Sequence, residues 1–135
     1  MIEYRKSLKT DLKSLVEIDK LANKENSDWI SLSLNQFLKI HINYSIYLAI
    51  DNKKIVGYLS TEIKKQNKEE VLFLDNLYIL KEYRKKNIAK KLVSLFLKEN
   101  NGKYRMIKLY STPSLEPFYK KLGFKTKYLT MVFEK

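Results

Sequence analysis

The chain has 135 residues, of which 44% are hydrophobic and 31% are charged, and it contains no cysteine. This composition predicts one folded domain over residues 1–135, and it excludes a disordered or fibrous protein, a disulfide framework and a thiolate metal site. The formal net charge of +12 is compatible with an anionic partner, but it is carried by lysines scattered along the whole chain and therefore indicates no particular ligand.

In the first half of the chain, the spacing of apolar residues changes from a strand period to a helix period and back. Ile2 and Tyr4 alternate with charged neighbours, and Thr10 or Asp11 can cap the helix that follows. A polar turn at 51–53 separates two strand-like runs and predicts a hairpin. The predicted elements are a strand at 2–5, helices at 12–22 and 31–42, and strands at 44–50 and 54–63.

In the second half, strands alternate with helices after a polar turn at 64–68. Ser114 is the expected cap of a short helix that Gly123 closes. The predicted elements are strands at 70–79 and 106–110, helices at 87–98 and 114–122, and a last strand or hairpin arm at 127–134. This order predicts an α/β fold with a mixed, mostly antiparallel central sheet of six to seven strands, flanked by about four helices.

A cationic turn at Arg84, Lys85 and Lys86 joins the predicted strand at 70–79 to the helix after it. The first backbone N–H groups of a helix lack intrahelical partners and carry partial positive charge, so such a junction can hold phosphate oxygens. Asn87 can cap this helix or adopt a left-handed turn. A solvated charge run on a surface turn explains the same residues equally well.

Arg84-x-x-Asn87-x-Ala89 resembles the pyrophosphate-binding signature of the GCN5-related N-acetyltransferase (GNAT) family, Gln/Arg-x-x-Gly-x-Gly/Ala, with Asn87 in place of the first glycine. Residues 112–124, which contain a Phe-Tyr pair and end in Leu-Gly-Phe, resemble its C-terminal motif. The order of predicted elements is also similar to that of the family, so the resemblance implies the GNAT fold.

The resemblance implies that acetyl-CoA is the acetyl donor and that a primary amine of a small molecule or protein is the acceptor. The two react directly in a ternary complex, without a metal. In family members a strand edge pairs with the pantetheine amides, and the helix start takes the pyrophosphate. The residues implied in CoA binding are Leu77, Tyr78, Ile79, Arg84, Lys85, Lys86, Asn87, Ile88, Ala89, Lys90 and Thr112.

The resemblance also implies catalytic residues. Tyr119 aligns with the tyrosine that family members place beside the CoA sulfur, where a phenol can give a proton to the departing thiolate; a tyrosine packed in the core is the alternative. Asp75 lies two residues before Leu77, on the same face by strand alternation, and is the first candidate for the general base. Glu62 and Glu70 are further candidates, each of which can instead be a surface charge, and water can replace a side-chain base.

In the family, the first two helices and their loop shape the acceptor groove. A tryptophan in such a loop is more often a packing anchor than a ligand contact. The positive net charge argues against a polycationic acceptor, unless Asp28, Glu62 and Asp75 form a local acidic pocket. The candidate walls of the groove are Trp29, Phe37 and Tyr44.

Two other functions stay open. A CoA-binding sensor or regulatory protein would have the same fold but would not catalyse the reaction. Asn87, in place of the glycine of the family signature, keeps this alternative open. A nucleic-acid-binding module fits the charge, but the lysines are neither concentrated on one helix nor interleaved with aromatic residues. We expect a cytoplasmic monomer or homodimer without a membrane partner, because the first residues lack a signal-peptide core and no apolar run can cross a bilayer.

Overall fold

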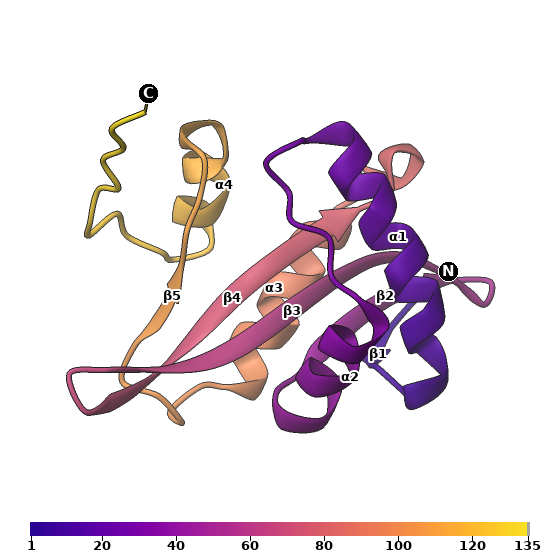
Figure 1. Cartoon of the computed structure of the whole chain (residues 1–135), viewed down its shortest axis with the longest axis horizontal. Helices are drawn as coiled ribbons and strands as arrows, with labels where there is room; N and C mark the ends of the chain where they lie inside the picture. Colours follow the sequence, from indigo (N-terminus) through magenta and orange to yellow (C-terminus); the bar gives the residue numbers. More distant parts are fainter. Residues whose placement is uncertain (135) are drawn as a thin grey trace.

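A five-stranded sheet lies at the centre of the structure, a computed structural model that describes residues 1–134 (Figure 1). The strands are β1 (Ile2–Lys6), β2 (Ile46–Asp51), β3 (Lys54–Gln66), β4 (Glu69–Ile79) and β5 (Ile107–Leu109). They lie side by side in chain order; β1 to β4 pair antiparallel, and β5 pairs parallel to β4. The predicted mixed, mostly antiparallel sheet is confirmed.

Four α-helices surround the sheet. They are α1 (Leu12–Glu25), α2 (Leu34–Asn43), α3 (Ile88–Glu99) and α4 (Glu116–Lys121), with short 3-10 turns η1 (Lys9–Asp11), η2 (Lys81–Tyr83) and η3 (Pro113–Leu115). α1 and α2 lie on one face, α3 lies on the other, and α4 stands beside β5 (Figure 1). In the core, Leu15, Phe37, Leu92 and Phe96 are completely shielded from solvent. None of the helices in residues 1–134 is long and apolar enough to span a membrane.

Local sequence explains where several elements begin and turn. Ser33 Oγ accepts a hydrogen bond from the Gln36 N–H at 3.2 Å, and the Gln36 side chain accepts one from the Ser33 N–H, so the pair forms a capping box for α2. The turns at Asn52-Lys53 and Asn67-Lys68 have positive φ at both positions, which suits tight hairpins. β3 therefore extends through Gln66, where a turn starting at residue 64 was expected.

The C-terminal segment differs from its prediction. Residues 127–134 contain no strand, so the described sheet has five strands and not six to seven. An alternating pattern becomes a strand only when it finds a partner edge, and three residues of β5 offer little of one. Met131 and Phe133 stay 91% and 94% exposed. The predicted cap at Ser114 is also wrong, because the helical turn begins one residue earlier, at Pro113.

Candidate active site

β4 has a β-bulge in its pairing with β3, and beyond this bulge its other edge is open. Two neighbouring residues of β3 are paired with Leu74 and Asn76, so Asp75 between them is an extra residue. Pairing between β4 and β5 covers only residues 72–74 of β4. Within the described sheet, the backbone of residues 77–79 therefore pairs with β3 on one side and has no strand partner on the other, and the Ile79 carbonyl accepts a hydrogen bond from Arg84 Nε. Such an edge can accept an extended ligand as an additional strand.

α3 begins after a left-handed residue. Asn87 has φ 62° and ψ 16°, and its side chain makes no capping hydrogen bond. The first intrahelical bond is donated by the Lys91 N–H to the Asn87 carbonyl. The N–H groups of Ile88, Ala89 and Lys90 consequently lack helical partners and can meet an anion. Asparagine tolerates the left-handed conformation better than other side chains, which explains how a residue other than glycine adopts it here.

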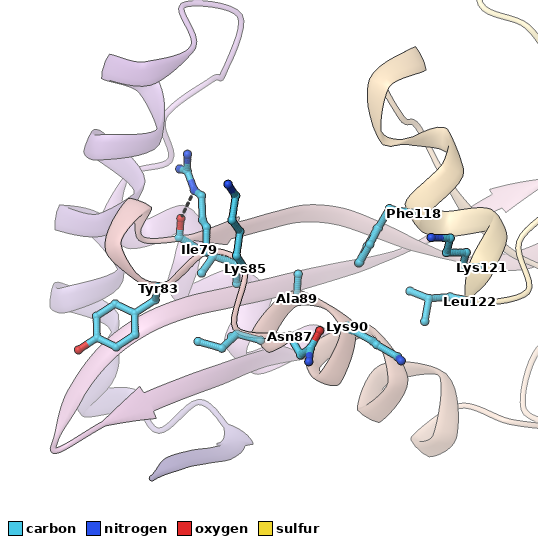
Figure 2. Close-up of a pocket in the computed structure, with 11 residues that line it drawn as sticks. Ile79, Tyr83, Lys85, Asn87, Ala89, Lys90, Phe118, Lys121 and Leu122 are labelled. Carbon is cyan, nitrogen blue, oxygen red and sulfur yellow. Dashed lines mark hydrogen bonds between the residues drawn. The ribbon is translucent and has the colours of Figure 1, made fainter.

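The start of α3 and the loop before it form one wall of a cleft of about 480 Å³, and α4 forms the opposite wall (Figure 2). Lys85, Lys90 and Lys121 line this cleft and give it positive charge. Phe118 points across it toward Ala89 (Figure 2). The cleft thus combines apolar walls with positive charge, as a ligand with both apolar and phosphate parts requires. Its other lining residues are Ile79, Tyr83, Arg84, Asn87, Ile88 and Leu122.

Arg84 is engaged by protein partners. Its Nε donates to the Ile79 carbonyl at 3.0 Å (Figure 2), and its Nη2 donates to Glu25 Oε2 at 2.6 Å. The Tyr78 hydroxyl donates to the other carboxylate oxygen of Glu25. Hydrogen bonds from Tyr78 and Arg84 lower the pKa of Glu25, so Glu25 stays ionised and offsets the guanidinium charge. Arg84 therefore ties the cationic loop to the end of α1.

Tyr119 packs between two aromatic rings. Its ring centroid is 5.0 Å from that of Phe118 and 5.8 Å from that of Phe124, and the residue is only 7% exposed. Burial raises the pKa of Tyr119, and no charged or hydrogen-bonding neighbour in the described chain contributes to the shift. The phenol therefore keeps its proton at neutral pH. Tyr119 can therefore pack in the core through its ring and still donate a proton from its hydroxyl.

The bulge also decides the orientation of Asp75. Tyr58 and Glu62 lie on one face of β3, the face of α1, because they are four residues apart and the Tyr58 hydroxyl bonds to α1. Leu77 pairs with the residue after Tyr58 and so lies on the other face. Asp75 contacts Glu62, and partial desolvation together with that contact raises the pKa of the solvent-accessible Asp75 carboxyl to about 7. The prediction that Asp75 and Leu77 share a face is wrong, since the extra residue interrupts the alternation.

Two of the predicted acceptor walls are packing residues. Trp29 meets the Tyr78 ring edge-on, with centroids 5.8 Å apart. Phe37 is completely buried and packs against Tyr58 at 6.0 Å. The prediction that Phe37 lines a groove is wrong, because the apolar face of α2 that carries it points into the core. Tyr44 is half-buried at the end of α2, and its contact with an acceptor stays a prediction.

A buried carboxyl group fixes the loop between α1 and α2. Asp19 is completely shielded from solvent. It accepts hydrogen bonds from Trp29 Nε1 at 2.7 Å, from the Leu32 N–H at 2.6 Å and from the Tyr58 hydroxyl at 2.9 Å. Three donors satisfy a polar group whose burial would otherwise be costly. The loop is thereby anchored to α1 and to β3 at once.

The cleft gathers most of the residues predicted to bind CoA, but not all of them. Lys86 Nζ lies over the Tyr83 ring at 5.2 Å, and the Thr112 hydroxyl is 3.1 Å from that of Ser114; neither residue lines the cleft. Three residues of α4 and its C-cap, at spacing i, i+3 and i+4, also line the cleft, and this spacing on one helix face could have been read from the sequence. The lining residues that the sequence did not indicate are Tyr83, Phe118, Lys121 and Leu122.

Solved structures of other proteins share the fold of this chain. Crystal structures of similar fold include a predicted acetyltransferase with acetyl-CoA from Clostridium acetobutylicum (TM-score 0.82, 19% identity, covering 99% of this chain and 96% of that one) and glucosamine-6-phosphate N-acetyltransferase from Arabidopsis thaliana (0.79, 17%, 99% and 98%). A third is an aminoglycoside N-acetyltransferase in complex with CoA (0.78, 18%, 100% and 95%). No curated protein sequence matches the chain.

The sequence itself carries the family assignment, since likeness at these identities shows the fold alone. The family model described as acetyltransferase (GNAT) domain matches residues 18–134, which include the open edge of β4, the start of α3 and α4. The chain therefore belongs to the GNAT acetyltransferase family.

Proposed function

We propose that this acetyltransferase moves the acetyl group of acetyl-CoA to a primary amine while donor and acceptor are bound together. The observation that carries the proposal is the open edge of β4, which leads into the free N–H groups at the start of α3. The pantetheine amides would pair with the backbone of residues 77–79, and the pyrophosphate would lie at residues 88–90 between Lys85 and Lys90. The crystal structures of similar acetyltransferases with acetyl-CoA and CoA support this choice of donor.

The proposed reaction forms an amide bond and breaks a thioester. Asp75 takes a proton from the acceptor ammonium, which its pKa of about 7 suits, and the neutral nitrogen attacks the thioester carbon. The Ile79 N–H polarises the carbonyl oxygen. As the C–S bond breaks, the Tyr119 hydroxyl gives its proton to the CoA thiolate, and the proton that the nitrogen loses on becoming an amide restores the phenol.

Two measurements test the proposal. Saturating acetyl-CoA is expected to raise the melting temperature, because binding to the folded state alone stabilises it. Lys90→Glu is expected to weaken this shift, whereas Lys103→Glu, at an exposed site after α3, is the matched control. Incubation with a panel of primary amines is expected to release CoA thiol. An absent thermal shift would refute the donor, and binding without thiol release from any amine would indicate a CoA-binding sensor instead.

A further inference from the structure

An ammonium group already lies close to Asp75, supplied by the protein itself. Lys64 Nζ is 4.5 Å from the centre of the Phe73 ring and 4.0 Å from Glu62 Oε2. Tyr110 stacks on Phe73 with centroids 5.9 Å apart and the planes inclined by 27°. An aromatic face beside a carboxylate is a favourable environment for an alkylammonium ion. We call Glu62, Phe73 and Tyr110 the ammonium seat.

Lys64 can leave the ammonium seat at little cost. Its side chain is 41% exposed, and that of Glu62 is 40% exposed, so the ion pair is a partly solvated one of small net value. If Lys64 turns into water, its Nζ no longer lies over the Phe73 ring. An ammonium group of a ligand can then take the same position.

The ammonium seat lies on the same face of the sheet as the reacting group of the proposed mechanism. Glu62 pairs with Phe73 across β3 and β4, and Asp75 contacts Glu62. The thioester would lie at the open edge that begins after Asn76, three residues along the strand from Phe73, or about 10 Å at the strand rise. Two nitrogen atoms of one acceptor molecule can span this separation.

A buried hydroxyl lies between the two positions. Ser60 is on the same face as Glu62, two residues before it, and is paired with Asn76. It is completely buried, and its Oγ is the one buried side-chain polar atom in residues 1–134 without a hydrogen-bond partner. Unsatisfied buried polar atoms are rare in folded proteins, and this one is at the rung of the β3–β4 ladder between the open edge and Asp75.

Lys108, another lysine near Phe73, already has partners of its own. Lys108, which is opposite Phe73 in β5, donates from Nζ to Gln66 Oε1 at 2.5 Å and lies over the Tyr128 ring at 5.1 Å. Lys64 is the occupant that a ligand would displace. A polycation was expected to fit a chain of net charge +12 only if Asp28, Glu62 and Asp75 form a local acidic pocket, and of these three the structure brings Glu62 and Asp75 together.

We propose that the acceptor is a small diamine. One nitrogen reacts beside Asp75, and the other, as an ammonium ion, displaces Lys64 Nζ from the ammonium seat between Glu62 and Phe73. The proposal rests on the proposed function for the identity of the reacting site, but binding of the second ammonium can be measured without any reaction.

The test compares two ligands of equal length on the CoA-loaded protein by titration calorimetry. Diaminooctane carries an ammonium at each end, and aminooctanol has a hydroxyl in place of one of them. We expect diaminooctane to bind about tenfold more tightly, from the cation–π and carboxylate contacts of one ammonium. Equal affinities, or no measurable binding of either ligand, would overturn the proposal.

Variants locate the effect in the ammonium seat. Lys64→Ala is expected to strengthen binding of diaminooctane several-fold, because it removes the internal competitor, and to leave aminooctanol unchanged. Lys65→Ala, the same charge change on the other face of β3, is the control and should alter neither affinity. Glu62→Gln should reduce the preference for diaminooctane several-fold. Identical effects of Lys64→Ala and Lys65→Ala would overturn the proposal. Thiol release from acetyl-CoA with aminooctanol tests the proposed function separately.

Discussion

Replacing Asn87 by valine tests whether the left-handed residue before α3 controls CoA binding. Asn87 has φ 62°, a conformation that costs an ordinary L-residue about 1–2 kcal/mol and is worst for a β-branched side chain. We therefore expect Asn87→Val to lower the free energy of unfolding by about 1–2 kcal/mol. If the chain relieves the strain by rotating φ, the N–H groups of residues 88–90 turn away from the cleft, and the affinity for acetyl-CoA should fall about tenfold or more.

Urea unfolding and calorimetric titration with acetyl-CoA measure the two effects. Asn87→Gly restores the residue of the family signature and should keep the free energy of unfolding within about 0.5 kcal/mol of the parent, with an affinity at least as high. Asn101→Val is the control, because Asn101 is exposed and has no positive φ. The reasoning is refuted if Asn87→Val and Asn101→Val have the same stability and the same affinity for acetyl-CoA.

Three further changes test other parts of the site. Tyr119→Phe should lower kcat by about a hundredfold and leave the Kd for acetyl-CoA within about twofold; equal losses in both would make Tyr119 a packing residue only. Asp75→Asn should stabilise the protein at pH 8 but not at pH 4. The raised pKa of Asp75, about 7, favours the folded state below the unfolded pKa near 4, and this advantage is lost as the pH rises through 7. After allowance for solvent screening, Asp75→Asn should raise the free energy of unfolding at pH 8 by about 1 kcal/mol. Urea unfolding at both pH values measures this, and an equal change in the free energy of unfolding at pH 4 and pH 8 would contradict it. Phe37→Leu should lower the free energy of unfolding by about 1 kcal/mol without changing the acceptor KM, whereas a KM that rises at unchanged stability would restore Phe37 as a groove wall.

The sequence predicts the elements well where the information is local. Apolar periodicity places α1, α3 and the long hairpin strands, because burying one face is enough to select a helix or a strand. The bulge at Asp75 is not visible in this way, since it is a property of pairing with β3. A single extra residue reverses the face of everything before it, and so the predicted orientation of Asp75 fails.

The features of the candidate site could likewise be predicted only where they depend on local sequence. The cationic turn and the left-handed option for Asn87 follow from residue types, and the structure places Arg84, Lys85 and Asn87 at the cleft but not Lys86. The partner of Arg84 could not be predicted, because Glu25 is 59 residues away in the chain. For Phe37, periodicity identifies an apolar face but does not say whether that face meets the core or a ligand.

The anchoring of the loop between α1 and α2 by Asp19 has a consequence for the evolution of acceptor choice. Trp29 and Leu32 are fixed through hydrogen bonds to Asp19, while Asn26, Ser27, Asp28 and Ile30 around them are exposed. Substitutions at these exposed positions should therefore cost little stability. If the loop borders the acceptor, as proposed, one buried carboxyl group would allow this border to change by single substitutions without repacking the core.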